Sequence, residues 1–477
     1  MDIPEGVTNI PDNAFYHCEG ITSVNFPSTL ESIGSNAFNS TGLTSVVIPE
    51  GFTTINESAF YHCANLAAVI IPEGVTTIRG NAFAYSGLRE LTLPSTIRSM
   101  SQSFYKCDSL VSLTLTEGIT TIGSSFYSCT SLKEVHIPSS IKRLEGNDFS
   151  SCSSLETVTI AEGVEAINGF SDCSKLSSIN IPSTATTISG FRNCESLKSI
   201  YIPKNVVDVT GFNGCSALEK VIIEDLESWC KILFSSYASY NPQCNAKHLY
   251  LGTPDENEEI TELVIPEGIT QLKRYAFGGL ASITSVTLPS SFTSLDNTTF
   301  YDCSGVENVY ATCNPNKLSW GGNGFKAEKA TMMHVTDIEA WRAKFLDANV
   351  TFVGDLTQFR YAATEKSAKF DEYNNFTGAS AVVAHELNFE TGEGLVTYLG
   401  NVTAIGENAL SGCAVITAIT VPEGVTAIDS HAFGGCTALT TVTLPSTIEL
   451  IADGAFEGSN IVADIYCTAN PDRKSVV

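Results

Sequence analysis

The chain has 477 residues, of which 43% are apolar, and this composition is typical of a folded protein. Its 52 aspartate and glutamate residues outnumber 26 lysine and arginine residues, so the net charge is −26 at pH 7. Such a surface repels phosphate backbones and anionic lipid heads, which argues against nucleic-acid or membrane-surface binding. The sequence also contains no apolar run of about 18 residues that could form a transmembrane helix.

A unit of 21 to 23 residues recurs along most of the chain, with the approximate form I-P-E-G-V-T-x-I-x-x-x-A-F-x-x-C-x-x-L-x-x-V-x. Its aromatic position, called the ring position below, is occupied by Phe15, Phe38, Phe60, Phe83, Phe104, Phe126, Phe149, Phe170, Phe191 and Phe212. After two breaks in the period, it is occupied by Phe277 and Phe300, and then by Leu410, Phe433 and Phe456. A fixed period of this size predicts a solenoid, in which each unit buries its apolar side against its neighbours.

Each unit predicts a circuit of short segments. The pattern L-x-x-V-x-I, as in residues 132–137, alternates with period two and predicts a strand, which the following proline ends. The pattern Val-Thr-x-Ile predicts a second extended piece, and Ala-Phe-x-x-Cys predicts a tight turn or a 3₁₀ piece. Stacked units therefore predict a mostly β, right-handed superhelix with a parallel concave sheet and short convex segments.

The two residues that flank the central position of each predicted strand point out of the sheet. This face is rich in hydroxyl side chains, and threonine suits an exposed pleated surface by propensity alone, so a solvated sheet and a binding face are equally supported. The candidate binding residues are Glu90, Thr92, Thr114, Glu134, His136, Thr159, Asn180 and Tyr201. Binding is favoured by the charged and aromatic side chains that gather along one stretch of the face: Glu134, His136, Lys198 and Tyr201.

Eleven of the fifteen cysteines lie three residues after the ring position: Cys18, Cys63, Cys107, Cys129, Cys152, Cys173, Cys194, Cys215, Cys303, Cys413 and Cys436. No C-x-x-C pair accompanies them, so no zinc site is predicted. Stacked strands hold Cβ atoms about 4.8 Å apart, wider than the ~3.8 Å of a disulfide, so we expect buried thiols that pack as small apolar groups. Cys230 and Cys244, outside the repeats, are the expected exceptions.

The acidic turns offer one glutamate per repeat, as at Glu73 and Glu117, and copies with Ser-Thr or Ser-Ser separate most of them. This alternation spaces like charges along the stack. A calcium column is the alternative interpretation, but a hard cation needs several clustered oxygens, and a single carboxylate per turn does not supply them. We therefore expect neither a metal nor another cofactor.

These repeats resemble the BspA-like (Treponema-type) leucine-rich repeats, a family found mainly on bacterial surface proteins, and about fifteen copies carry the resemblance. Residues 224–262 resemble the family's helical insert, and residues 309–353 resemble its terminating unit. The capping box Thr336-Asp337-Ile338-Glu339 independently predicts a helix start in that unit. Because residues 382–405 resemble the segment that opens such arrays, the resemblance implies two leucine-rich-repeat solenoids, 1–353 and a truncated 354–477.

Catalytic motifs such as G-x-S-x-G, H-E-x-x-H and a phosphate loop are absent from the sequence, so we expect a protein that is not an enzyme. The resemblance implies adhesion: recognition of a host or matrix protein, another cell-surface protein or a glycan through the concave face. It implies no nucleic-acid partner and no direct membrane insertion, and we expect a monomer. The alternative is a passive spacer that displays a domain outside this sequence.

The resemblance alone implies location at the cell surface or secretion. The first residues, Met1-Asp2-Ile3-Pro4, already belong to a repeat and contain no signal peptide. We therefore expect the sequence to be a piece of a longer protein.

Overall fold

The computed structural model describes residues 1–320, 331–336, 338, 340–341, 350–363, 365–366, 368–388, 391–460 and 464–467. Contacts within the chain divide it into two compact units. Unit 1 comprises Met1–Ile260, Leu272–Ser282 and Thr298–Cys303, and unit 2 comprises Thr261–Gln271, Ile283–Asn297 and Ser304–Val477. The division into two solenoids near residue 354 stays a prediction.

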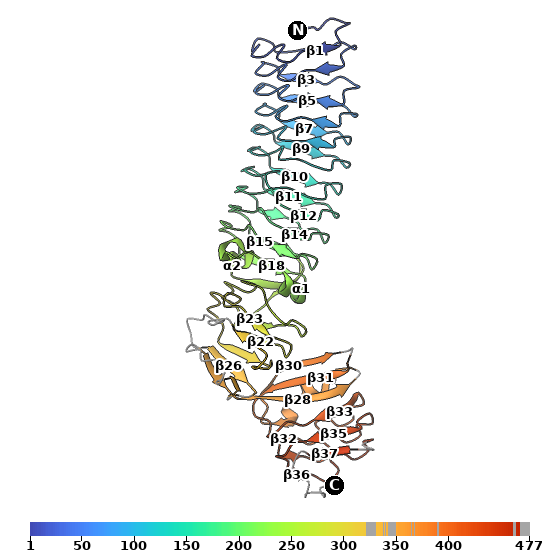
Figure 1. Cartoon of the computed structure of the whole chain (residues 1–477), viewed down its shortest axis with the longest axis vertical. Coiled ribbons are helices and arrows are strands. Elements are labelled where there is room, and N and C mark those ends of the chain that lie inside the picture. The colour runs from blue at the N-terminus through green and yellow to red at the C-terminus, as the bar shows by residue number, and fades with distance from the viewer. Residues whose placement is uncertain are drawn as a thin grey trace. The chain divides into compact units, whose positions relative to one another are not determined.

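The predicted strand is present in most repeats of unit 1, and it pairs in parallel with the strand one repeat away (Figure 1). Val135 lies opposite Val158, so equivalent repeat positions are in register. Pro138 ends its strand because proline has no N–H for the ladder. The strands of this sheet row are β3 (Ser45–Val47), β5 (Ala68–Ile70), β7 (Glu90–Leu93), β9 (Ser112–Leu115), β10 (Glu134–Ile137), β11 (Thr157–Ile160), β13 (Ser178–Ile179), β15 (Ser199–Ile202), β17 (Lys220–Ile223) and β19 (Leu249–Gly252).

A second row of two-residue strands forms where Val-Thr-x-Ile predicts an extended piece. Ile55 lies opposite Ile78, and both side chains are buried, so this row closes the other side of the core. Its strands in unit 1 are β1 (Asn9–Ile10), β2 (Ser32–Ile33), β4 (Thr54–Ile55), β6 (Thr77–Ile78), β8 (Ser99–Met100), β12 (Ala166–Ile167), β14 (Thr187–Ile188), β16 (Asp208–Val209) and β18 (Leu233–Phe234).

The segment around each ring position is a tight turn that buries the ring. Ser124 and Ser128 flank Phe126 with φ of 60° and 62°, a left-handed backbone that reverses the chain on both sides of the ring. The Phe126 ring is fully buried, and its centroid lies 5.5 Å from that of Phe104 and 5.6 Å from that of Phe149, with nearly parallel planes. The ring positions from Phe15 to Phe212 thus form a continuous stack along the core of unit 1.

The cysteines three residues after the ring position form a column beside this stack. The Cys152 Sγ lies 3.1 Å from the carbonyl oxygen of Phe126, the ring residue one repeat earlier, to which the thiol donates a weak hydrogen bond. The same contact, at 2.9–3.4 Å, recurs at Cys63, Cys107, Cys129, Cys173, Cys194, Cys215 and Cys303. This repeat position therefore favours a small side chain that can also donate a hydrogen bond.

The cysteines of the column are free thiols, as predicted. Every cysteine of the column is buried except Cys18, which belongs to the first repeat of the sequence. The expectation that Cys230 is an exception is wrong, because the inward face of a short helix buries it to 2% exposure. Cys244 is only partly buried, as expected.

The acidic turns are joined to the hydroxyl-rich turns by hydrogen bonds between neighbouring repeats. The Glu117 carboxylate accepts from the backbone N–H and the hydroxyl of Ser139 at 2.9 and 3.1 Å. In return, the Ser140 hydroxyl accepts from the N–H of Gly118 and donates to the carbonyl of Ile119. The backbone N–H of Ser139 lowers the pKa of Glu117. Equivalent pairs begin at Glu5, Glu73, Glu162, Glu267 and Glu423, so the alternation serves hydrogen bonding as well as charge spacing.

The segment predicted as a helical insert contains two short helices. Asp225 caps the first by accepting from the N–H of Ser228 at 2.7 Å. Trp229 is buried, and its Nε1 donates to the Ala276 carbonyl at 3.0 Å, which anchors the insert to the next repeat of unit 1. The insert elements are α1 (Leu226–Lys231), the 3₁₀ helix η1 (Ala238–Tyr240), α2 (Pro242–Ala246) and β20 (Asn257–Glu259), which pairs antiparallel with β19.

Unit 2 contains two parallel arrays and an antiparallel meander. The first array is β21 (Glu262–Val264), β22 (Ser285–Leu288), β24 (Asn308–Ala311), β26 (Thr331–Val335) and β27 (Val350–Val353), with β23 (Ser294–Leu295) pairing β25 (Ser319–Trp320). The meander comprises β28 (Leu356–Ala363), β30 (Ala381–Asn388) and β31 (Glu393–Leu399). The second array continues from β28 as β33 (Ile416–Thr420), β35 (Thr441–Leu444) and β37 (Asp464–Cys467).

Short elements complete unit 2: η2 (Ala368–Asp371), η3 (Tyr373–Asn375), β29 (Phe376–Thr377), β32 (Ala404–Ile405), β34 (Ala427–Ile428) and β36 (Leu450–Ile451). The buried rings of Phe359, Phe376 and Tyr398 pack together under the meander. Asp337 and Glu339 of the predicted capping box lie outside the described residues. In the part of the chain that is described, no helix has the length and apolar character needed to cross a membrane.

Candidate functional site

The outward side chains of the sheet row form two columns on one face of unit 1, called the sheet face below. One column runs through Ser45, Ala68, Glu90, Ser112, Glu134, Thr157, Ser178, Ser199 and Lys220. The other runs through Val47, Ile70, Thr92, Thr114, His136, Thr159, Asn180, Tyr201, Ile222 and Tyr250. The outward positions predicted from the sequence therefore share one surface.

The eight predicted binding residues all belong to these columns, and all except the half-buried Tyr201 are exposed. Thr92 lies directly opposite Thr114 in the ladder, and the Nδ1 of His136 lies 2.9 Å from the Thr159 hydroxyl. The structure does not bring His136 and Tyr201 together, because β11 and β13 lie between their strands along the stack.

Two of the predicted residues are already engaged in the sheet. The Asn180 side-chain amide accepts from the N–H of Ile160 at 2.7 Å and donates to its carbonyl at 2.8 Å, replacing ladder bonds that β13 does not make. Burial and the neighbouring Glu224 carboxylate raise the pKa of Tyr201 to about 12, so its hydroxyl stays protonated. Asn180 is thus a structural residue, whereas Tyr201 presents a neutral amphipathic ring.

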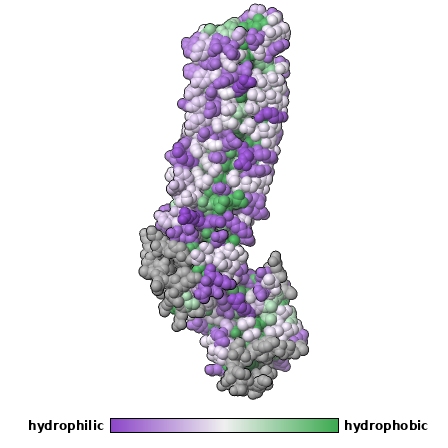
Figure 2. Space-filling view, in the orientation of Figure 1, coloured by the Kyte–Doolittle hydropathy of each residue, from purple (hydrophilic) through white to green (hydrophobic). Residues whose placement is uncertain are grey.

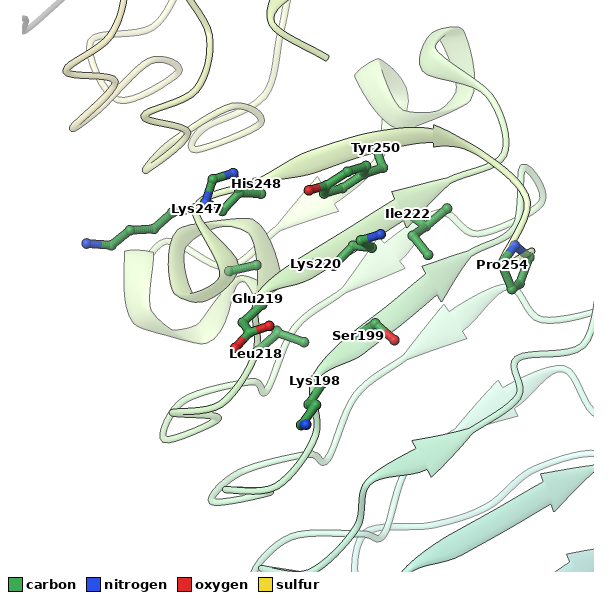
Figure 3. Close-up of a pocket in the computed structure, with 11 residues that line it drawn as sticks. Lys198, Ser199, Leu218, Glu219, Lys220, Ile222, Lys247, His248, Tyr250 and Pro254 are labelled. Atoms are coloured by element: carbon green, nitrogen blue, oxygen red, sulfur yellow. The ribbon is translucent and has the colours of Figure 1, made fainter. Parts of the chain in front are cut away.

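An open hollow of about 590 Å³ lies on the sheet face at the insert, a volume in the range of ligand sites. In Figure 3, Lys220 and Ile222 of β17 lie between Ser199 on β15 and Tyr250 on β19, and Pro254 lies at the rim. Ile222 points out of the sheet but is only 4% exposed. The lining residues are Lys198, Ser199, Leu218, Glu219, Lys220, Ile222, Ala246, Lys247, His248, Tyr250 and Pro254.

Lys220 and Tyr250 form the middle of the hollow. The Lys220 ammonium lies 4.2 Å from the centroid of the Tyr250 ring, a cation–π contact, and donates to the Asn257 side-chain oxygen at 3.2 Å. Since Tyr250 and Asn257 belong to the β19–β20 hairpin, these contacts fix the hairpin against β17, the last repeat strand before the insert.

An acidic group beside this centre, Glu259, is hydrogen-bonded by its neighbours. The Nδ1 of His248 lies 2.6 Å from a carboxylate oxygen of Glu259. Partial burial acts to raise the pKa of Glu259, but hydrogen bonds from side chains such as His248 and Tyr250 outweigh it and leave the pKa below its usual range.

Two further ammonium groups at the hollow are exposed and have no hydrogen-bond or ion-pair partner among the described residues: Lys198 and Lys247. Lys247 is the left-handed C-cap of α2, with φ of 63°, which places it at the rim. With Lys220, the lining carries three lysines against Glu219, and the adjoining Glu259 carboxylate brings the formal charge of this set to 3 − 2 = +1. The hollow is therefore a basic site in a chain whose net charge is −26.

The repeat pattern predicts only part of this site. Lys198 and the outward positions of β17 follow from the sequence, but Lys247, His248 and Tyr250 lie in the insert, where the period breaks. One signal was available: Lys198 and Lys220 occur in adjacent repeats of a chain with only 26 basic residues. Among the described residues, no group of three or more metal-ligating side chains is placed to hold an ion.

A separate row of rings lies in the turns rather than on the sheet face. Tyr61, Tyr85, Tyr105 and Tyr127 follow one another with centroids 5.3–5.5 Å apart, and the Lys106 ammonium lies 5.5 Å from the Tyr85 centroid. A hydrogen bond with Tyr85 raises the pKa of Tyr105 to about 12. These rings already pack on one another, so the row stabilises the turns and offers matched control positions away from the sheet face.

The repeats match a known family. Residues 1–103, 100–219, 255–333 and 395–471 match the family model described as a BspA type leucine rich repeat region. The chain belongs to the BspA-type leucine-rich-repeat family. The resemblance seen in the repeat sequence is thereby confirmed, and the structure agrees with the solenoid expected of BspA-type repeats. A search of curated proteins finds no match to this BspA-type chain.

Several solved structures are similar to this chain. A leucine-rich repeat protein from Bacteroides ovatus is 17% identical, with 98% of this chain and 86% of that chain covered and a TM-score of 0.40. A leucine rich cell surface protein from Faecalibacterium prausnitzii is 21% identical, with coverages of 66% and 79% and a TM-score of 0.29. The T. pallidum leucine rich repeat protein is 22% identical, with coverages of 41% and 77% and a TM-score of 0.24.

Proposed function

We propose that this BspA-type protein is a non-enzymatic adhesion module that recognises a protein or glycan partner through its sheet face. The observation that carries the proposal is the hollow on that face, where Lys198 and Lys247 have no partner within the described residues. An ammonium group that makes no internal contact can bind a ligand without breaking one. Location at the cell surface is proposed with this function, on the family resemblance.

The other end of the sheet face supports the same function. Val47 and Ile70 lie opposite each other in the ladder and are 58% and 61% exposed. Figure 2 shows apolar side chains as a broken stripe along unit 1, with hydrophilic side chains on both sides. Apolar contact area bordered by polar groups is the usual composition of a recognition surface.

The proposal is tested by presenting the chain to immobilised matrix proteins and to a glycan array. For any partner retained, we expect His136→Ala or Tyr201→Ala to weaken binding, because tyrosine is a common hot-spot residue and both positions lie on the sheet face. The control is His62→Ala, in a turn. If binding depends on His62 and on neither sheet-face residue, the sheet face is not the recognition surface, and a role as a spacer is favoured instead.

A further inference from the structure

The hollow on the sheet face has a composition that indicates what it binds. Its lining includes Lys198 and Lys247, the apolar side chains of Leu218 and Ile222, and the Tyr250 ring. A site that combines free cationic groups with an aromatic ring suits a ligand with a negative group on a compact, partly apolar body.

The surroundings favour a hydroxyl-rich ligand. The sheet-face positions that lead to the hollow are mainly hydroxyl or amide side chains, including Thr159, Ser178 and Ser199. They repeat at the rung spacing of about 4.8 Å, so a linear chain lying along the columns would meet a donor or acceptor at each step. A polysaccharide carries hydroxyl groups at regular intervals along its length, whereas an acidic peptide carries few hydroxyl groups.

We propose that the hollow binds an acidic polysaccharide, with separate sugar carboxylates at Lys198 and Lys247 and a sugar ring against Tyr250. This inference rests on the proposed function and names the ligand class of the same face. Lys220 takes the role of a positioning residue, because its ammonium is already held by Tyr250 and Asn257. The acidic remainder of the surface repels the same ligand, which confines binding to the hollow.

Binding is measured calorimetrically with an oligogalacturonate, which carries a carboxylate on every sugar. Its methyl ester, with the same sugars and no charge, is the matched ligand control. We expect Lys198→Ala and Lys247→Ala each to weaken binding about tenfold, the loss expected for one charge-assisted hydrogen bond. Lys133→Ala is the protein control, because Lys133 occupies the same repeat position as Lys198 but lies at β10, outside the hollow. The effect should shrink as salt is added.

The outcomes separate the two proposals. Binding of the oligogalacturonate but not its ester, with losses only at Lys198 and Lys247, supports the acidic-sugar site. Equal binding of a polyglutamate peptide, equal binding of the ester, or an equal loss with Lys133→Ala overturns it. If no acidic sugar binds but a protein partner still depends on His136 or Tyr201, the ligand class is wrong and the proposed function stands. A sulfated dextran distinguishes sulfate from carboxylate recognition, and tighter binding of the sulfate would overturn the assignment of a carboxylate.

Discussion

The Lys220 ammonium lies 4.2 Å from the centre of the Tyr250 ring, across the junction between the last regular repeat strand and the insert. The repeat pattern places Lys220 on the sheet face, but it does not place Tyr250 there, because Tyr250 lies in the insert. The contact shows how the insert completes a surface that the repeats begin.

Replacing this lysine should loosen the junction. We expect Lys220→Met to lower the free energy of unfolding by about 1 kcal/mol, since it removes a cation–π contact and the hydrogen bond to Asn257. Thermal unfolding compared with Lys133→Met, at the exposed residue that precedes β10, is the measurement. An identical unfolding temperature for the two variants would show that the contact adds nothing.

Truncation of a stacked ring should cause local damage. Phe126→Ala removes a fully buried ring between Phe104 and Phe149, and we expect a cost of about 3–5 kcal/mol. Because each repeat contacts only its neighbours, amide hydrogen exchange should rise near Phe126 and fade within a few repeats. An even rise across unit 1 would contradict this nearest-neighbour coupling. Tyr127→Ala, in the turn row, serves as the control.

Among the cysteines whose side chains the structure describes, native thiol reactivity should be confined to Cys18. Burial raises the pKa of Cys107 to about 12 and that of Cys152 well above its ordinary value of 9.0, so neither forms a reactive thiolate near neutral pH. Burial also raises the pKa of Cys244 to about 12, so we expect a thiol reagent to label Cys18 in the native protein, and Cys244 and the buried column only after denaturation. Rapid native labelling of Cys152, or a disulfide between consecutive column cysteines, would contradict the packing described above.

The stability of unit 2 should decline as the pH rises from mildly acidic to mildly alkaline. Burial and a hydrogen bond to the Glu267 carboxyl raise the pKa of Glu386 from its ordinary 4.5 to about 8, and the charge of Lys366 offsets part of this rise. Above pH 4.5 the unfolded chain loses this proton while the folded chain keeps it, so stability declines from pH 4.5 to about 8 and then levels off.

Glu386→Gln should remove that decline, because the amide cannot ionise. Unfolding of unit 2, followed at pH 4 and pH 8, should show a stabilising effect of the substitution at pH 8 only. Glu393→Gln, on the neighbouring strand and exposed, is the control. A variant whose advantage is equal at both pH values would mean that Glu386 ionises normally in the folded protein.

The repeat period predicts the structural elements that recur in each repeat. The strand Glu134–Ile137, the buried ring of Phe126 and the thiol of Cys152 all follow from positions that recur every 21 to 23 residues. A period cannot specify contacts made by a segment that interrupts it. Lys247 and Tyr250 reach the sheet face, and Cys230 is buried, through helices and a hairpin that only the folded insert positions.

The repeat pattern of the sequence also does not predict the hydrogen bonds between repeats. The sequence alone explains the alternation of Glu117 with Ser139 as charge spacing, whereas the fold adds hydrogen bonds between the two residues. Asn180 likewise occupies an outward position in the pattern, yet its amide completes the ladder of β11. Pattern identifies which face a side chain belongs to, and the local backbone decides whether its polar atoms are free.

Lysine footprinting tests the central claim, that recognition occurs at the hollow of the sheet face, most directly. The full chain is acetylated briefly with and without saturating oligogalacturonate, and modification is quantified at each lysine by mass spectrometry. We predict protection of Lys198 and Lys247, with Lys133 on the same face and Lys106 in the turn row unchanged. Protection of Lys106 with no change at Lys198 and Lys247 would place recognition in the turns and contradict the account.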